Sequence, residues 1–272
     1  MAASTPVALT IAGSDSGGGA GIQADLKAFA ARGVHGACAI TAITAQNTLG
    51  VEAVHEVPGE IIRAQIRAVA GDIALDAVKV GMLGGQDAIV AVAGALDELD
   101  PPVPVVVDPV MVAESGARLL AEGTQEALIR EIVPRAWVLT PNVLEARALL
   151  GEEPLPGADE AEAERLARGV LALGARSVVL TGGHRDSASD LLVAGAGEPA
   201  IEIEGPRHPD GAAHGSGCTH SAALAASLAL GETLEQAARS ARLLSGEAVR
   251  RGLRELGAGA GPVDALDLAA RR

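Results

Sequence analysis

The chain has 272 residues, of which 49% are hydrophobic and 34 are glycine, a composition that suits one globular domain with a large core and excludes disordered or fibrous structure. Its 21 Lys and Arg against 35 Asp and Glu give a formal net charge of −14, so it lacks the basic surface expected for binding nucleic acid or an anionic membrane. Phe29 and Trp137 are too few aromatic side chains for a base-stacking surface. We therefore expect aliphatic residues to form the core, and any anionic ligand to need a local source of positive charge.

The cysteines and the N-terminus bear on the cellular setting. Cys38 and Cys218 belong to no Cys-x-x-Cys motif, which argues against a zinc site and favours a reducing, cytoplasmic environment. Residues 1–6 show no basic segment leading into an apolar one, and polar residues interrupt the longest uncharged stretch, 33–51. We expect neither a signal peptide nor a membrane span.

Short aliphatic runs alternate along the chain with segments of helical periodicity. The runs predict strands buried on both faces at residues 7–12, 37–43, 77–80, 103–107, 137–139 and 177–180. The periodic segments predict helices at residues 21–31, 60–69, 87–99, 124–132, 159–173 and 222–230. This alternation predicts an α/β fold with a mostly parallel sheet covered by helices on both faces, in one domain spanning residues 1–272.

Two segments depart from this alternation. Residues 51–57 follow a predicted strand closely, and residues 191–193 and 200–203 flank a glycine-containing turn. Both patterns predict antiparallel strands added to the sheet.

The first candidate ligand segment is residues 13–21, which hold five glycines where the first predicted strand meets a helix. Glycine lets backbone N–H groups approach a ligand closely, and a helix N-terminus favours anions or polar groups. We favour a ligand loop over a plain turn. The chain has no Walker A motif, which argues against a P-loop, no G-x-G-x-x-G, which argues against a Rossmann dinucleotide site, and no G-x-S-x-G, which argues against a serine hydrolase.

The second candidate is residues 214–221, a Gly-rich segment entering the predicted buried helix at 222–230. Unpaired N–H groups at such a helix start form an anion hole. Cys218 lies there, and we expect the helix field to lower its thiol pKa. The alternative is a small buried cysteine in a glycine turn.

Acidic side chains form the third candidate. Asn142 and Glu145 have the spacing of a helix capping box, and Glu145 can equally hold Mg²⁺ through water. Asp108 leaves a buried strand at the carboxyl edge of the sheet, where open α/β sheets bind ligands, and can hold Mg²⁺ or cap the next turn. Residues 44–48, 79–83 and 181–184 end other strands at the same edge.

In their order along the chain, these segments resemble the ribokinase superfamily and, within it, the hydroxymethylpyrimidine and phosphomethylpyrimidine kinases of thiamine biosynthesis. The resemblance rests on residues 8–27, 44–48, 81–83, 108–112, 140–145, 182–184 and 214–219. It implies a three-layer αβα ribokinase-like fold and a homodimer with residues 51–57 near the contact. It also implies transfer of phosphate from ATP, with Mg²⁺, to 4-amino-5-hydroxymethyl-2-methylpyrimidine and then to the resulting monophosphate.

The resemblance also implies roles for particular residues. The pyrimidine pocket is expected to contain Gly13, Gly19, Asp25, Gln46, Met82 and Val110. ATP and Mg²⁺ are expected near Asp108, Asn142 and Glu145, with Asp108 and Glu145 as metal ligands, directly or through water. Gly215, Ser216 and Gly217 are expected to form the anion hole, with Cys218 in the place of the aspartate base of sugar kinases.

Three positions differ from the pattern of that family. Glu114 stands where members carry lysine or a small hydroxyl residue, Thr181 stands where they carry lysine, and residues 208–213 lack a common Asn-Thr pair. Two alternatives therefore stay open. One is a vitamin B6 kinase of the same superfamily, and the other is a ligand-binding relative without transfer activity.

Overall fold

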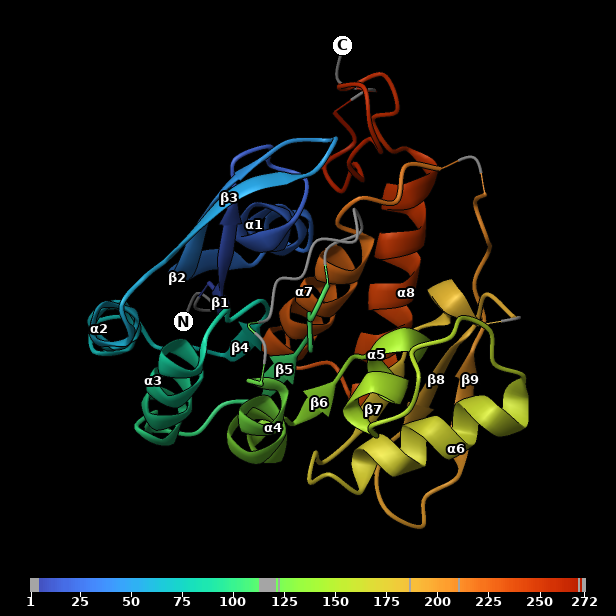
Figure 1. Cartoon of the computed structure of the whole chain (residues 1–272), viewed down its shortest axis with the longest axis horizontal. Coiled ribbons are helices and arrows are strands. Elements are labelled where there is room, and N and C mark those ends of the chain that lie inside the picture. The colour runs from blue at the N-terminus through green and yellow to red at the C-terminus, as the bar shows by residue number, and fades with distance from the viewer. Residues whose placement is uncertain are drawn as a thin grey trace.

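A mixed β-sheet forms the middle layer of the protein (Figure 1). The structure is a computed structural model that describes residues 5–112, 121, 123–185, 187–209, 211–268 and 270. Within these residues the sheet has nine strands in the order β3-β2-β1-β4-β5-β6-β7-β8-β9. Their bounds are β1 Val7–Asp15, β2 His35–Gln46, β3 Val51–Glu56, β4 Ala77–Val80, β5 Val105–Val107, β6 Val138–Leu139, β7 Val178–Leu180, β8 Asp190–Val193 and β9 Ala200–Ile203.

The six central strands are parallel, and antiparallel strands are added at both ends of the sheet. β3 pairs antiparallel with β2, while β8 pairs antiparallel with both β7 and β9. The sequence prediction of a mostly parallel sheet with these additions is confirmed. Because the parallel strands all end at one edge, their following loops meet there.

Helices cover both faces of the sheet (Figure 1). One face carries α1 Gly21–Ala31, α7 Ser216–Ala229 and α8 Leu234–Arg250. The other carries α2 Gly59–Ala70, α3 Gln86–Asp97, α4 Gln125–Ala127, α5 Val143–Leu149 and α6 Glu160–Leu171. α4 continues as a π-helical turn, η1 Leu128–Ile132, and a 3-10 turn, η2 Val133–Arg135, and a further 3-10 turn, η3 Gly182–His184, follows β7.

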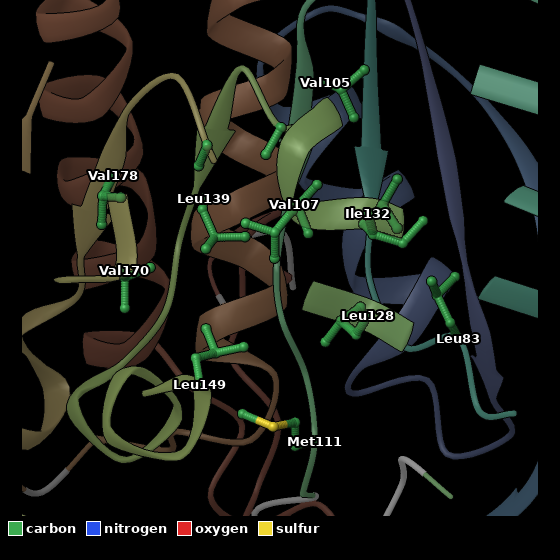
Figure 2. Packing of buried hydrophobic residues seen from close by; sticks show 14 of the residues in the cluster. Leu83, Val105, Val107, Met111, Leu128, Ile132, Leu139, Leu149, Val170 and Val178 are labelled. Carbon is green, nitrogen blue, oxygen red and sulfur yellow. The ribbon is translucent and has the colours of Figure 1, made fainter. Parts of the chain in front are cut away.

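Successive side chains of a strand point to opposite faces of the sheet and so contribute alternately to two aliphatic cores. In β5, Val105 and Val107 face the α2–α6 side while Val106 faces α7. Figure 2 shows Val107 between Leu139 of the next strand and Ile132 of the η1 turn. Fully burying one such side chain contributes about 1.5–3 kcal/mol, so a core nearly without aromatic residues is built from many small contributions.

The structure differs from the sequence prediction in two helices. α7 begins at Ser216, earlier than the predicted segment, and α8 was not predicted because its mean hydropathy is low. α8 carries a local signal nonetheless, since Thr233 and Gln236 form a capping box at its start. In the described part of the chain, no helix combines the length and the apolar character needed to cross a bilayer.

Candidate active site

A pocket of about 1060 Å³ lies at the carboxyl edge of the sheet. It is lined by the ends of β1 and β2, the segments that follow β4, β5, β6 and β7, and the first turn of α7. The motifs at 13–21, 44–48, 79–83, 108–112, 140–145 and 214–218 all contribute to its wall. The fold therefore gathers segments that are far apart in sequence into one cavity.

Asp15 organises the glycine loop at the end of β1. Its Oδ1 accepts the N–H of Gly17 at 2.8 Å, and its Oδ2 accepts the N–H groups of Gly19 and Ala20 at 3.0 and 2.8 Å. His214 Nε2 lies 3.3 Å from the same Oδ2. Burial of the carboxyl group opposes ionisation, but these hydrogen bonds outweigh it and hold the pKa of Asp15 below its usual value. β1 runs through Gly13 to Asp15, so only the second half of the predicted loop lies outside the strand.

The glycine loop packs directly against the start of α7. A Cβ on Gly19 would overlap the His214 ring, and a Cβ on Gly215, whose φ is +81°, would overlap the carbonyl oxygen of Gly19. These two positions therefore require glycine. The two glycine segments form one continuous wall.

The C-terminal segment 252–264 extends this wall toward the tip of the β2–β3 hairpin, and we call the combined edge of the pocket the rim. The N–H of Val263 donates to the carbonyl of His214 at 3.1 Å, and the N–H of Gly259 donates to Thr48 Oγ1 at 3.2 Å. Figure 1 shows this coil beside the tip of the β2–β3 hairpin. The hairpin and the anion-hole segment are therefore joined by one piece of chain.

Gln46 and Met82 also line the pocket. Ser16 fixes the backbone of Gln46, since its hydroxyl donates to the Gln46 carbonyl at 2.7 Å and accepts the Gln46 N–H at 2.8 Å. The Gln46 amide is half-buried, and its Oε1 lies 3.2 Å from Thr44 Oγ1. Met82 packs under Gly13, where a Cβ would lie 3.0 Å from the thioether sulfur. This end of the pocket offers one amide and an apolar surface, which suits a small polar aromatic ring.

Gly215, Ser216, Gly217 and Cys218 line the pocket at the N-terminus of α7. The N–H of Ser216 donates to the carbonyl of Ala213 at 2.9 Å. This 14-residue helix directs its positive end at the cavity, a favourable place for phosphate. The expectation of a lowered thiol pKa at Cys218 is wrong. Burial of the sulfur raises the pKa of Cys218 to about 12, with Asp108 and Asp25 adding to the effect and Lys79 opposing it.

Asp108, Asn142 and Glu145 line a further part of the pocket wall. The capping box is present, because Asn142 Oδ1 accepts the N–H of Glu145 and Glu145 Oε2 accepts the N–H of Asn142, both at 2.9 Å. Asp108 Oδ2 accepts the hydroxyl of Ser221 at 3.0 Å. Burial raises the pKa of Asp108, while burial together with the charge of Asp108 raises the pKa of Glu145 to about 8.

This pair of carboxyl groups fits a magnesium ion. The charge of Asp108 disfavours ionisation of Glu145, a situation that a divalent cation reverses, and carboxylate oxygen is the donor that Mg²⁺ prefers. No group of three or more His, Cys, Asp or Glu side chains in the described ranges is arranged to hold a metal ion. Phosphate oxygens and water would therefore complete the coordination of Mg²⁺.

Two of the predicted substrate residues do not line the pocket. Gly19 packs against His214, and Asp25 is fully buried beneath the floor, where it holds Lys79. Val110 lines the pocket as predicted, while Glu114 falls outside the described residues.

The comparisons with known proteins agree with this site. The sequence profile of the family described as phosphomethylpyrimidine kinase matches residues 15–264.

The chain belongs to this family.

A relative from Rhizobium meliloti named hydroxymethylpyrimidine/phosphomethylpyrimidine kinase is 47% identical over 95% of this chain and 96% of its own. Among solved structures, an ADP complex of Bacillus subtilis pyridoxal kinase superposes with a TM-score of 0.85 at 37% identity, covering 98% of this chain and 99% of that one. A phosphomethylpyrimidine kinase from Clostridium difficile superposes with a TM-score of 0.77 at 40% identity, covering 89% and 99%. The expectation of a ribokinase-like αβα fold is confirmed.

The sequence reading missed three residues that shape the site. Asp15 was read only as part of a glycine motif, although an acid within a glycine-rich turn is itself a signal for backbone capping. Lys79 was read as part of a strand. Asp190 gave no signal, yet its carboxylate lies 2.8 Å from both the N–H of Gly182 and His220 Nε2, which joins the segment after β7 to α7.

Proposed function

We propose that this protein transfers phosphate from ATP to the hydroxymethyl group of 4-amino-5-hydroxymethyl-2-methylpyrimidine, and then to the monophosphate to form the diphosphate, in thiamine biosynthesis. One observation carries the proposal. Gln46 and Met82 line the same single pocket as Cys218 and the first turn of α7, so a small ring held by the former can present its alcohol to a phosphate held at the latter. Membership of the phosphomethylpyrimidine kinase family supports this assignment.

At the ring end, Gln46 pairs with the aminopyrimidine edge, since its amide offers both a donor and an acceptor to a ring edge that presents both. The apolar surface of Met82 packs on the ring, and Gly13 leaves room for both. The pocket thereby orients the hydroxymethyl group toward α7.

At the phosphate end, the N–H groups of Gly215, Gly217 and Cys218 bind the transferring phosphate and its developing charge. The hydroxyl oxygen attacks the γ-phosphorus, the bond from that phosphorus to the β,γ-bridging oxygen breaks, and ADP leaves. Cys218 orients the attacking oxygen at the floor. Because phosphoryl transfer passes through a loose transition state, the hydroxyl proton passes late to an oxygen of the transferred phosphoryl group, and positioning matters more than a strong base.

Asp108 and Glu145 are the residues that would hold Mg²⁺, directly or through water. The ion supplies neutralisation of charge on the phosphate oxygens. The protein itself holds the two carboxyl groups in position, because the N–H of Asn142 donates to Glu145 and the hydroxyl of Ser221 donates to Asp108.

A vitamin B6 kinase is the second candidate, favoured by the close superposition on a pyridoxal kinase. Both substrates are small aromatic primary alcohols, so the same pocket geometry suits either. Turnover assays with Mg·ATP and, in parallel, hydroxymethylpyrimidine, its monophosphate and pyridoxal decide between them. A higher kcat/KM for both pyrimidines than for pyridoxal supports the main proposal, a preference for pyridoxal overturns it, and pyrimidine binding without turnover establishes a binding protein.

We also propose that residues 1–272 act as a single cytoplasmic kinase domain in a homodimer. The β2–β3 hairpin presents three exposed apolar side chains, Ile43, Leu49 and Val54, which a second copy would cover. Sedimentation at micromolar concentration tests the dimer, and a monomeric mass would overturn it.

A further inference from the structure

A fully buried ion pair lies beneath the floor of the pocket. Lys79 Nζ in β4 lies 2.9 Å from both carboxylate oxygens of Asp25 in α1, and neither side chain has any exposure to solvent. The hydroxyl of Thr10 donates to Asp25 Oδ2 at 2.5 Å. Burying two charges is costly unless each is well paired, and here the carboxylate is paired with the ammonium and also hydrogen-bonded.

Two neighbouring strands and a helix fix the positions of the two charged groups in this ion pair. Thr10 and Lys79 are partners in the register of β1 and β4, and α1 supplies the acid. Gly81 leaves the space for the ammonium, since a Cβ there would lie 2.7 Å from Nζ. Lys79 contributes to the lining of the pocket and Asp25 does not, so the pair is buried directly behind the wall with the lysine as its member nearer the cavity.

The charges around the cavity make this orientation significant. Among the described residues that line the pocket, Lys79 is the only lysine or arginine, whereas Asp15, Asp108, Glu145 and Glu152 are acidic. Lys79 interacts electrostatically with Cys218 and with Asp108 as well as with its partner. An acidic protein that binds a polyphosphate needs local positive charge, and here a lysine adds to the N-terminus of α7.

We propose that Lys79 is a positioning residue for phosphoryl transfer: held by Asp25, its ammonium stabilises the negative charge that develops on the attacking oxygen beside Cys218. The inference deepens the proposed function and rests on it. A fixed charge in a site that excludes water stabilises such charge strongly, because it needs no reorganisation as the reaction proceeds.

The test compares two variants with the wild type. Lys79→Met alone leaves the Asp25 carboxylate buried without its partner, which destabilises the fold. The double variant Lys79→Met, Asp25→Asn removes both charges and keeps similar volumes, so it is the variant that decides. Arg135→Met with Asp97→Asn removes an ion pair outside the pocket, whose shortest N–O distance is 2.6 Å, and serves as the matched control.

Three measurements are made on each protein: the Tm, kcat with both KM values, and the rate at which iodoacetamide alkylates Cys218, mapped by mass spectrometry to separate it from Cys38. For the double variant we expect a folded protein whose kcat is lower by roughly 10²-fold, with both KM values within about threefold of wild type. Its Cys218 alkylation rate should fall, but by less than the loss of the Lys79 charge alone would cause, because the Asp25 carboxylate that is removed with it raises the thiol pKa. The control should match the wild type in kcat and alkylation.

A double variant with wild-type kcat, or with unchanged Cys218 alkylation, would overturn the inference and leave the pair as part of the core. If the wild type binds the pyrimidine but transfers no phosphate, the proposed function fails separately. The alkylation comparison then still decides whether the charge of Lys79 acts on Cys218.

Discussion

Replacing Asp15 with asparagine tests how the glycine loop is held in place. The carboxylate accepts three backbone N–H groups, at 2.8, 3.0 and 2.8 Å, from Gly17, Gly19 and Ala20. An amide keeps one carbonyl oxygen, which can serve the two donors at Oδ2. Its NH₂ group then faces the N–H of Gly17, so one charge-assisted bond is lost and the other two become neutral.

The size of the effect follows from these bonds. A hydrogen bond to a charged group contributes about 1.5–3 kcal/mol and a neutral one about 1, so the variant should lose at least about 2.5 kcal/mol of unfolding free energy. For a chain of this size each kcal/mol changes the Tm by about 2–4 °C, which predicts a Tm lower by at least about 5 °C. Because this loop lines the pocket, the KM for the pyrimidine should rise as well.

The pH dependence gives a sharper test. The pKa of Asp15 is lower in the folded protein than its usual value, so its stabilisation is present above the unfolded pKa and disappears as the pH falls through the folded pKa. Calorimetry at pH 5 and at pH 3.5 should therefore show a smaller Tm difference between wild type and Asp15→Asn at the lower pH. Asp76→Asn, which alters an exposed carboxylate that accepts one N–H from Val7 at 2.8 Å, is the control and should lower the Tm less. A Tm difference at pH 5 no larger than that of the control, or one independent of pH, would refute the reasoning.

Three further substitutions test other parts of the pocket. Gln46→Ala should raise the pyrimidine Kd by roughly 5- to 150-fold, the equivalent of 1–3 kcal/mol for unpaired polar groups, and an unchanged Kd by titration calorimetry would contradict the role of the amide. Cys218→Ala should lower kcat by roughly 10²-fold with nearly intact ATP and pyrimidine binding, and Cys218→Ser should also be slower; full activity in both would make Cys218 a packing residue. Gly215→Ala introduces a Cβ at a φ of +81° against the Gly19 carbonyl, so its Tm should fall, whereas Gly217→Ala meets open space in a helix and should not lower the Tm.

The sequence predicted those parts of the fold that depend on local pattern. Aliphatic runs located the central strands, including β4 at its observed bounds, and the Asn142–Glu145 spacing predicted the cap of α5. Contacts between distant residues were not predictable in this way. Nothing in the sequence near Lys79 indicates Asp25 as its partner, because β4 and α1 come together only in the folded protein.

The thiol pKa illustrates the same limit at a single group. The position of Cys218 at a helix N-terminus is visible in the sequence and favours ionisation of the thiol. Burial of the thiol is a property of the packed fold, and it has the larger effect on the pKa. A local motif therefore predicted the position of Cys218 but gave the wrong direction for its pKa.

The C-terminal coil has a consequence for how the pocket forms during synthesis. The rim joins Asp15 to His214, Thr48 to Gly259, and His214 to Val263. The glycine loop leaves the ribosome early, but the segment that packs against it, which begins at His214, is synthesised about two hundred residues later. Since contacts this distant along the chain form slowly, the pocket of the nascent protein stays incomplete until residue 263 has emerged, although every described strand of the sheet has been synthesised by residue 203. Translation speed and chaperone access in that interval will therefore affect how much of the chain acquires a working site.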